Sequence, residues 1–215
     1  MPQNHKNPLD NHLTICYNVI VKEKNLIGGD WMSKTFPGTT IEVTRIEKGS
    51  SRTLFNGIFA TGGITLSQVS VMTGLEPYVV QNWVKRGFLT SPKKRVYSRS
   101  QFARIIIINM LRESLQIDKI CGLIEVIGGE LDDETDDLIS DDELYHRYVD
   151  MISDNELNIL DAKTVERASK NAVADCAETI PGARKKLETI LRIMIYAHTA
   201  TEFRRNAEQI LNTLG

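Results

Sequence analysis

Apolar and polar positions between residues 64 and 104 follow the pattern of short helices joined by tight turns. Thr65 and Gln68 have the spacing of a capping box, in which each side chain bonds the backbone N–H of the other residue. The apolar residues that follow fall on one helical face: Leu66, Val69 and Met72. Gly74 comes next, and glycine takes the left-handed backbone of a turn at little cost. A helix of about two turns is therefore predicted from Thr65 to Gly74.

A second helix is predicted from Pro77 to about Arg86, because proline suits the first helical position and Gly87 ends the pattern. Its apolar side is expected to be buried: Val80, Trp83 and Val84. Its polar side is expected to face outward: Tyr78, Gln81, Asn82 and Lys85. Two short helices joined by a glycine-containing turn indicate a helix-turn-helix, whose second helix enters the DNA major groove.

A short basic loop and a third helix complete this pattern. Phe88 and Leu89 are expected to close the core, and residues 92–97 then form a loop that we interpret as a wing. The wing carries three adjacent cations: Lys93, Lys94 and Arg95. Ser98 and Gln101 repeat the capping-box spacing, so a helix is predicted from Ser98 to about residue 113.

From residue 65 to about residue 124, this order of elements resembles the MerR-type winged helix-turn-helix regulators. Seven residues stand at that family's motif positions: Thr73, Gly74, Pro77, Gly87, Leu89, Tyr97 and Ser98. The chain has Gln-Asn-Trp-Val at residues 81–84, where the family usually has Arg-Tyr-Tyr-Glu on its recognition helix. It is most similar to an uncharacterised bacterial branch with a helical C-terminal region. The resemblance implies DNA-binding architecture, whereas this departure gives no support for the family's promoter-distorting mechanism.

The second half of the chain has the pattern of further helices. Apolar spacing predicts a helix at 117–127, a capping box at Ser140 and Glu143 starts another, and a small-residue face marks a third at 162–176. The last helix, 183–214, has a wide apolar face suited to an antiparallel helical pair or a dimer seam.

The N-terminal segment, residues 1–60, is the least well defined by its pattern. Partial alternation at 39–46 predicts a strand, and a turn at 48–51 followed by an apolar piece at 53–60 suggests a small β hairpin. The Gly28-Gly29 pair before Met32 can be encoded by a ribosome-binding sequence, so residues 1–31 are interpreted as a candidate non-native extension.

Charge is divided unevenly along the chain. The net charge is −2, but residues 64–104 hold seven cationic side chains and one acidic side chain, a local balance of +6. Phosphate binding depends on such a local patch, so the overall acidity does not exclude DNA. Residues 130–143 hold nine acidic side chains and no basic one. Their spacing partly fits a calcium loop, but Asp137 stands where that loop requires glycine, so a solvated acidic loop is expected instead.

Composition favours a cytoplasmic globular protein. Hydrophobic residues make up 41% and charged residues 25%, and no apolar run approaches the roughly 20 residues that span a bilayer. No secretory signal is visible. The three cysteines, Cys16, Cys121 and Cys176, are far apart and are expected to be reduced, buried thiols. No catalytic constellation, cofactor motif or metal cluster emerges, so an enzyme is not expected.

The sequence therefore predicts a mainly α protein with a winged helix-turn-helix at 61–127, an acidic loop at 128–140 and a helical C-terminal region at 141–215. The expected function is a transcriptional regulator that binds double-stranded DNA as a homodimer, with the C-terminal region dimerising or sensing an effector. The alternative is a protein-interaction adaptor whose winged domain no longer binds DNA.

Two groups of residues are the candidate DNA contacts. The outer face of the second helix is expected to reach base edges, because Asn and Gln pair with adenine and Lys reaches guanine. Its members are Tyr78, Gln81, Asn82 and Lys85. The remaining cations are assigned to phosphates: Arg86, Lys93, Lys94, Arg95 and Arg99. The competing interpretation is an ordinary solvated helix face.

Overall fold

A computed structural model describes residues 35–128, 138–178 and 180–214, and in this part the predicted mainly α fold is confirmed. The elements in chain order are α2 (Ser50–Ile58), β1 (Ile64–Thr65), α3 (Leu66–Thr73), α4 (Pro77–Lys85), β2 (Val96–Tyr97), α5 (Arg99–Leu111), α6 (Ile117–Gly128), α7 (Asp141–Ile152), α8 (Ala162–Ala172) and α9 (Ala183–Leu211). Three sequence interpretations lie outside the described residues: the start at Met32, the thiol of Cys16 and the acidic stretch up to Asp137.

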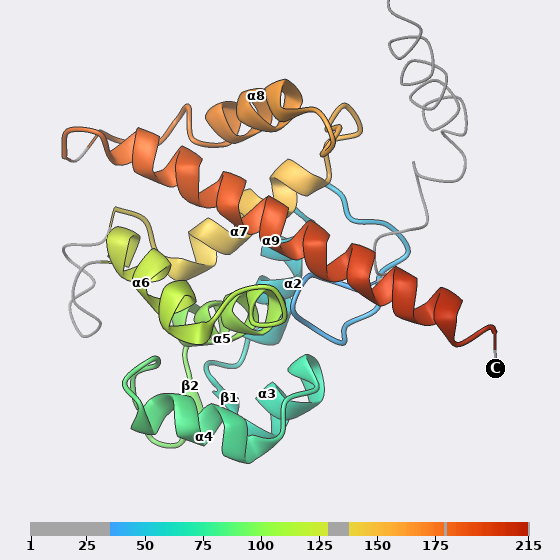
Figure 1. The fold of residues 1–215 in the computed structure, drawn as a ribbon. Coiled ribbons are helices and arrows are strands. Elements are labelled where there is room, and N and C mark those ends of the chain that lie inside the picture. The colour runs from blue at the N-terminus through green and yellow to red at the C-terminus, as the bar shows by residue number, and fades with distance from the viewer. Residues whose placement is uncertain (1–34, 129–137, 179, 215) are drawn as a thin grey trace, which may run out of the picture.

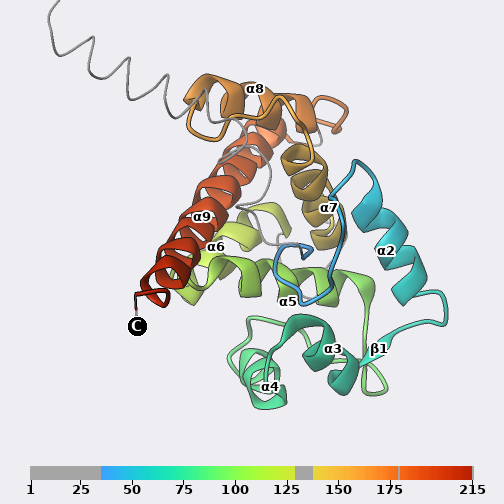
Figure 2. The same ribbon diagram turned by 90° about the vertical axis from the view of Figure 1, so that its right-hand side faces the viewer.

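Helix α5 lies at the centre of the molecule (Figures 1 and 2). It packs against α3, α6, α7 and α9, and its four consecutive isoleucines, residues 105–108, are all fully buried. A helix that is apolar on every side needs neighbours on every side. The helix-turn-helix and the C-terminal helices therefore share one hydrophobic core around α5.

The hairpin predicted within residues 39–60 is wrong. Residues 50–58 form α2, whose buried residues Ser51 and Phe55 are four positions apart, the spacing of one helical face. Residues 39–46 form no strand and take part only in an isolated bridge between Thr35 and Glu42. Because α2 packs against α7, the fully buried Phe55 contributes to the main core.

The small antiparallel pair of the fold is formed by other residues. β1 pairs with β2, with Ile64 opposite Tyr97 and Thr65 opposite Val96. This pairing connects the residue that caps α3 to the strand that leaves the wing. The wing is therefore attached directly to the start of the helix-turn-helix.

A turn at residues 36–41 ties α3 to α5 and α7. The backbone N–H of Thr40 donates to the carbonyl of Met72 at 2.9 Å, and the Thr40 hydroxyl donates to the carbonyl of Val71 at 2.7 Å. On the other side, the Tyr145 hydroxyl of α7 donates to the carbonyl of Pro37 at 2.9 Å. A Cβ added at Gly38, where φ is +74°, would lie 2.2 Å from the carbonyl oxygen of Ile106 in α5. Only glycine fits there.

Helices α7, α8 and α9 pack on the side of α5 away from α4 (Figures 1 and 2). The start of α7 is joined to α5 by an ion pair in which Arg104 Nε lies 2.7 Å from a carboxylate oxygen of Asp141, and each side chain is only 11% exposed. Ser140 caps α7 as predicted by accepting from the N–H of Glu143. The Glu143 carboxylate lies against Arg52 of α2 and Arg147 instead.

Candidate nucleic-acid interface

The two predicted helices of the helix-turn-helix begin and end close to the expected residues. Thr65 and Gln68 form the complete capping box of α3, and Gly74 ends it with φ of 70°. Leu75 is buried, and its N–H donates to the hydroxyl of Thr73. Pro77 occupies the first turn of α4 as predicted. These local interactions set the direction in which α4 leaves the turn.

The buried and exposed faces of α4 also match the prediction. Val80 is fully buried and Trp83 is 4% exposed, so this side packs against the domain. The predicted base-contacting residues lie on the exposed side: Tyr78, Gln81, Asn82 and Lys85. Tyr78 is 69% exposed, which is unusual for a large aromatic side chain. A helix is about 10–12 Å across with its side chains, so α4 can lie in a major groove about 12 Å wide.

The tip of the wing is a two-residue turn made by cations. The N–H of Val96 donates to the carbonyl of Lys93 at 3.0 Å, which leaves Lys94 and Arg95 as the central residues. Both have positive φ, 52° and 65°. A two-residue hairpin turn with positive φ at both positions normally contains Asn-Gly or Asp-Gly. Here the strained positions carry exposed positive charges instead.

The base of the wing is held by Gln101 of α5. Its side-chain amide donates to the Thr90 carbonyl at 3.0 Å, to the Thr90 hydroxyl at 2.7 Å and to the Ser91 carbonyl at 3.2 Å. Its side-chain oxygen accepts from the Ser98 N–H at 2.9 Å, which completes the predicted capping box. Gln101 thus starts α5 and anchors the wing with one side chain. The capping-box pattern identified the first role but carries no signal for the second.

Three of the seven cations between residues 64 and 104 are engaged within the protein. Arg86 forms an ion pair with Asp118 at 3.3 Å and lies over the ring of Phe88. Arg99 donates to Asn56 at 2.7 Å. Arg104 forms the largely buried ion pair with Asp141 of α7. The other four of these seven cations are exposed and form no ion pair with any described residue: Lys85, Lys93, Lys94 and Arg95.

Another residue that the sequence did not reveal positions α3. The side-chain amide of Asn109 in α5 donates to the carbonyls of Thr73 and Gly38, both at 3.0 Å. It therefore links the end of α3 to the turn at residues 36–41. Its position beside four isoleucines is the one available signal, because a polar side chain on a buried helix needs a hydrogen-bonding partner.

Figures 1 and 2 place α3, α4 and β1 together at one end of the molecule, beyond α5 and away from α8. The exposed face of α4 and the wing next to β1 therefore belong to the same end of the protein. Between them they combine hydrogen-bonding side chains, one aromatic ring and unpaired cations. This combination suits a polyanion that also presents hydrogen-bond donors and acceptors, as the base edges of nucleic acids do.

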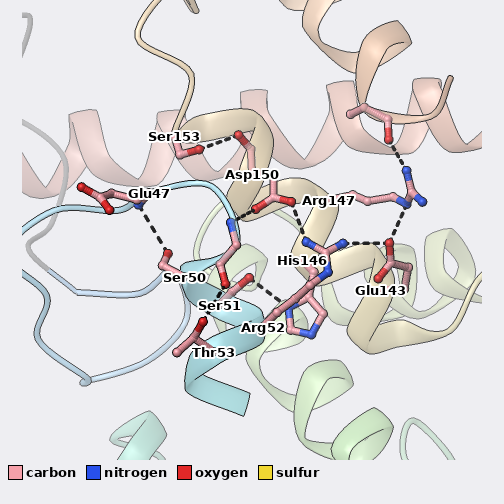
Figure 3. Close-up of polar contacts among 12 residues, drawn as sticks. Glu47, Ser50, Ser51, Arg52, Thr53, Glu143, His146, Arg147, Asp150 and Ser153 are labelled. Carbon is pink, nitrogen blue, oxygen red and sulfur yellow. Dashed lines mark hydrogen bonds and ion pairs between the residues drawn. The ribbon is translucent and has the colours of Figure 1, made fainter. Parts of the chain in front are cut away.

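A separate cleft of about 880 Å³ lies between α2, α7 and α8. Arg52 crosses it, with contacts of 2.8 Å to Glu143 and 2.6 Å to Asp150 (Figure 3). Arg147 contacts Glu143 and Asp175. Both arginines are paired with carboxylates, so the network joins the three helices and leaves neither guanidinium free for an anion. Within the described residues, no group of three or more His, Cys, Asp and Glu side chains is arranged to hold a metal ion.

The two described cysteines are buried, as the sequence predicted, and neither forms a disulfide. Burial raises the pKa of Cys121 to about 11 and also raises the pKa of Cys176. Thiols with raised pKa values are poor nucleophiles near neutral pH. Both residues therefore act as packing groups.

Residues 64–148 match the family model of a Domain of unknown function (DUF1836). The description names no activity. The matched segment begins at β1 and ends within α7, so it contains the candidate interface together with the helix that packs on α5. No curated protein and no solved structure matches the chain. Among the described residues, no helix combines the length and apolar character needed to cross a bilayer.

Proposed function

We propose that the protein is a cytoplasmic transcriptional regulator that binds specific sequences of double-stranded DNA through a winged helix-turn-helix like that of the MerR-type regulators. The observation that carries the proposal is the exposed polar face of α4 at the same end of the molecule as the exposed, unpaired cations of the wing. A solvated helix face would need neither the aromatic ring of Tyr78 nor a strained turn of cations.

Each group has a distinct role in this proposal. Gln81 and Asn82 contact base edges, because their amides can pair in bidentate fashion with adenine, and Lys85 reaches guanine. Lys93, Lys94 and Arg95 contact phosphates, which strengthens binding to every sequence. Arg86 and Arg99 approach phosphates only if they give up part of their internal contacts. The helical C-terminal region joins two copies, so that a homodimer contacts two half-sites, or receives an effector.

A protein-interaction adaptor is the second candidate. Val71 is 73% exposed and Tyr78 is 69% exposed, and exposed apolar side chains also suit a protein partner. The two functions differ in their dependence on salt, because only polyanion binding releases many counterions.

A salt series tests the proposal. Fluorescence anisotropy with duplex DNA of mixed sequence should give an affinity that falls linearly with salt on logarithmic axes. Replacing Lys93, Lys94 and Arg95 with Ala should reduce that slope by about 2.7, which is roughly 0.9 for each lost phosphate contact. The matched control removes three exposed cations from α8: Lys163, Arg167 and Lys170. An equal effect in the control, or no binding at low salt, would contradict the proposal.

A second measurement separates base contacts from phosphate contacts. Duplexes selected from a random pool against the purified protein provide a preferred sequence. Asn82→Ala should weaken binding to that sequence by roughly 5- to 150-fold, the equivalent of about 1–3 kcal/mol, and should leave mixed-sequence DNA nearly unchanged. The wing variant should weaken both. If Asn82→Ala weakens both equally, Asn82 does not contact a base.

A further inference from the structure

Tyr78 is the first residue in a row of side chains along the exposed face of α4. The other members of the row follow at three, four and seven positions along the chain: Gln81, Asn82 and Lys85. Residues at these spacings lie on one face of a helix. Tyr78 is also the second residue of α4. The N-terminal residues of a recognition helix are the ones that contact base edges, so Tyr78 has the position of a base-contacting residue.

The side chain of Tyr78 has no polar or aromatic partner among the described residues. It is 69% exposed, and neither its ring nor its hydroxyl forms a hydrogen bond or a ring contact there. A large aromatic ring is usually more buried than this. Tyr78 therefore offers an apolar surface to a binding partner, on the same face as the amides of Gln81 and Asn82 and the charge of Lys85.

The major groove presents one apolar group that such a ring can contact. Guanine, cytosine and adenine present hydrogen-bond donors and acceptors there, whereas thymine also presents its C5 methyl group. Contact between an aromatic ring and this methyl group removes apolar surface of both from water, which is favourable. The chemistry of Tyr78 therefore matches thymine.

We infer that the ring of Tyr78 contacts the C5 methyl group of a thymine, so that the start of α4 selects thymine. The inference rests on the proposed DNA binding and adds the base that this residue recognises. Gln81 or Asn82 then selects adenine, and Lys85 selects guanine, as proposed above. Tyr78 is not one of the MerR-type motif positions, so the resemblance does not imply this role.

The row of side chains also sets the order of the selected bases. Tyr78 and Lys85 are seven residues apart, which is about 10.5 Å along a helix. Successive bases of one strand are about 3.4 Å apart, so the thymine and the guanine lie about three base pairs apart. Gln81 and Asn82 lie between Tyr78 and Lys85, so the adenine belongs between the other two bases. The recognised segment is therefore about four base pairs long.

Replacing thymine with uracil tests the contact, because uracil lacks only the methyl group. Each thymine of the duplex selected from the random pool is replaced in turn, and fluorescence anisotropy measures binding of the full chain. At the position that faces Tyr78, the replacement should weaken binding about fourfold, which is the effect of one buried methyl-sized group. A pair of 5-methylcytosine with guanine at that position should bind about fourfold more tightly than unmodified cytosine with guanine.

Three variants assign the effect to the ring of Tyr78. In Tyr78→Ala, thymine and uracil should bind equally well at that position, whereas Tyr78→Phe keeps the ring and should keep the fourfold difference. Tyr196→Ala is the matched control, because it removes a 42% exposed tyrosine from α9, on the side of α5 away from α4 (Figures 1 and 2). It should also keep the difference. No variant removes a cation, so the salt slope should stay the same in all three.

The possible failures of the inference and of the proposed function differ in this experiment. Uracil that weakens wild-type binding at no position, or a thymine preference that persists in Tyr78→Ala, overturns the inference and leaves DNA binding intact. Equal losses of affinity in Tyr78→Phe and Tyr78→Ala would place the hydroxyl on a phosphate and overturn it as well. A wild-type chain that binds no duplex at low salt contradicts the proposed function itself.

Discussion

Replacing Lys94 with Asn and Arg95 with Gly should make the protein more stable and make it bind DNA less well. Both residues have positive φ at the tip of the wing. A left-handed backbone costs most residues roughly 1–2 kcal/mol, and Asn and Gly are the residues that adopt it most readily in two-residue hairpin turns. The double variant should therefore gain about 1–2 kcal/mol, since part of the strain is shared with the rest of the hairpin.

The loss of DNA affinity follows from the same two positions. Each phosphate contact contributes a slope of about 0.9 against the logarithm of salt, so removing two cations should reduce the slope by about 1.8. At roughly 0.15 M salt, the same relation gives about a 30-fold weaker affinity. Stability and binding are thus predicted to change in opposite directions.

Two assays check this prediction. Thermal unfolding should show an increase of roughly 2–8 °C, because about 1 kcal/mol corresponds to about 2–4 °C in a chain of this size. Anisotropy with mixed-sequence duplex gives the salt slope. The control variant, Lys163→Gln with Lys170→Gln on α8, removes the same charge from the other end of the molecule. A fall in melting temperature would refute the argument from backbone strain, and an unchanged slope would show that the wing does not contact phosphates.

Two further predictions concern the body of the protein. Gly38→Ala should lower the free energy of unfolding by at least about 1–2 kcal/mol, because φ is +74° and the new Cβ would meet the carbonyl of Ile106. The control is Gly57→Ala in α2, where the new Cβ would have open space around it, so this variant should be neutral or stabilising. Urea unfolding measures both variants. Acidification should also destabilise the fold. Burial and the positive charge of Arg52 lower the pKa of His146 from 6.5 to about 4. Burial and the positive charge of Arg205 lower the pKa of His198 in the same way, from 6.5 to about 4. Between these pH values the unfolded chain binds protons that the folded chain does not, so stability should fall as pH falls, by up to about 1.4 kcal/mol per pH unit for each histidine. Imidazoles that titrate near 6.5 in an NMR experiment would contradict this prediction.

The parts of the fold that sequence predicted are those with local causes. Thr65 with Gln68, Ser98 with Gln101, Pro77 and Gly74 each act on the backbone within a few residues, and the structure has the expected caps and turns there. The exposed face of α4 followed from helical periodicity alone. Such signals need no knowledge of distant parts of the chain.

The parts that sequence missed depend on contacts between distant residues. Alternation at residues 39–46 suggests a strand, but among the described residues this segment forms only the isolated bridge between Thr35 and Glu42, and its start bonds to α3 instead. Arg104 was counted as part of the cationic patch, yet its partner Asp141 lies in another helix. Gln101 and Asn109 hold loops whose positions only the folded chain defines. Periodicity and caps carry no information about such partners.

The turn at residues 36–41 also sets the size of the unit that can fold. It supplies the hydrogen bonds from Thr40 to the last turn of α3 and accepts the bond from Tyr145. The segment that matches the family model, residues 64–148, contains both ends of this connection but not the turn itself. On its own, that segment would lose the hydrogen bonds through which the turn connects α3 to α7. A piece of this protein chosen for independent study must therefore include the turn at residues 36–41.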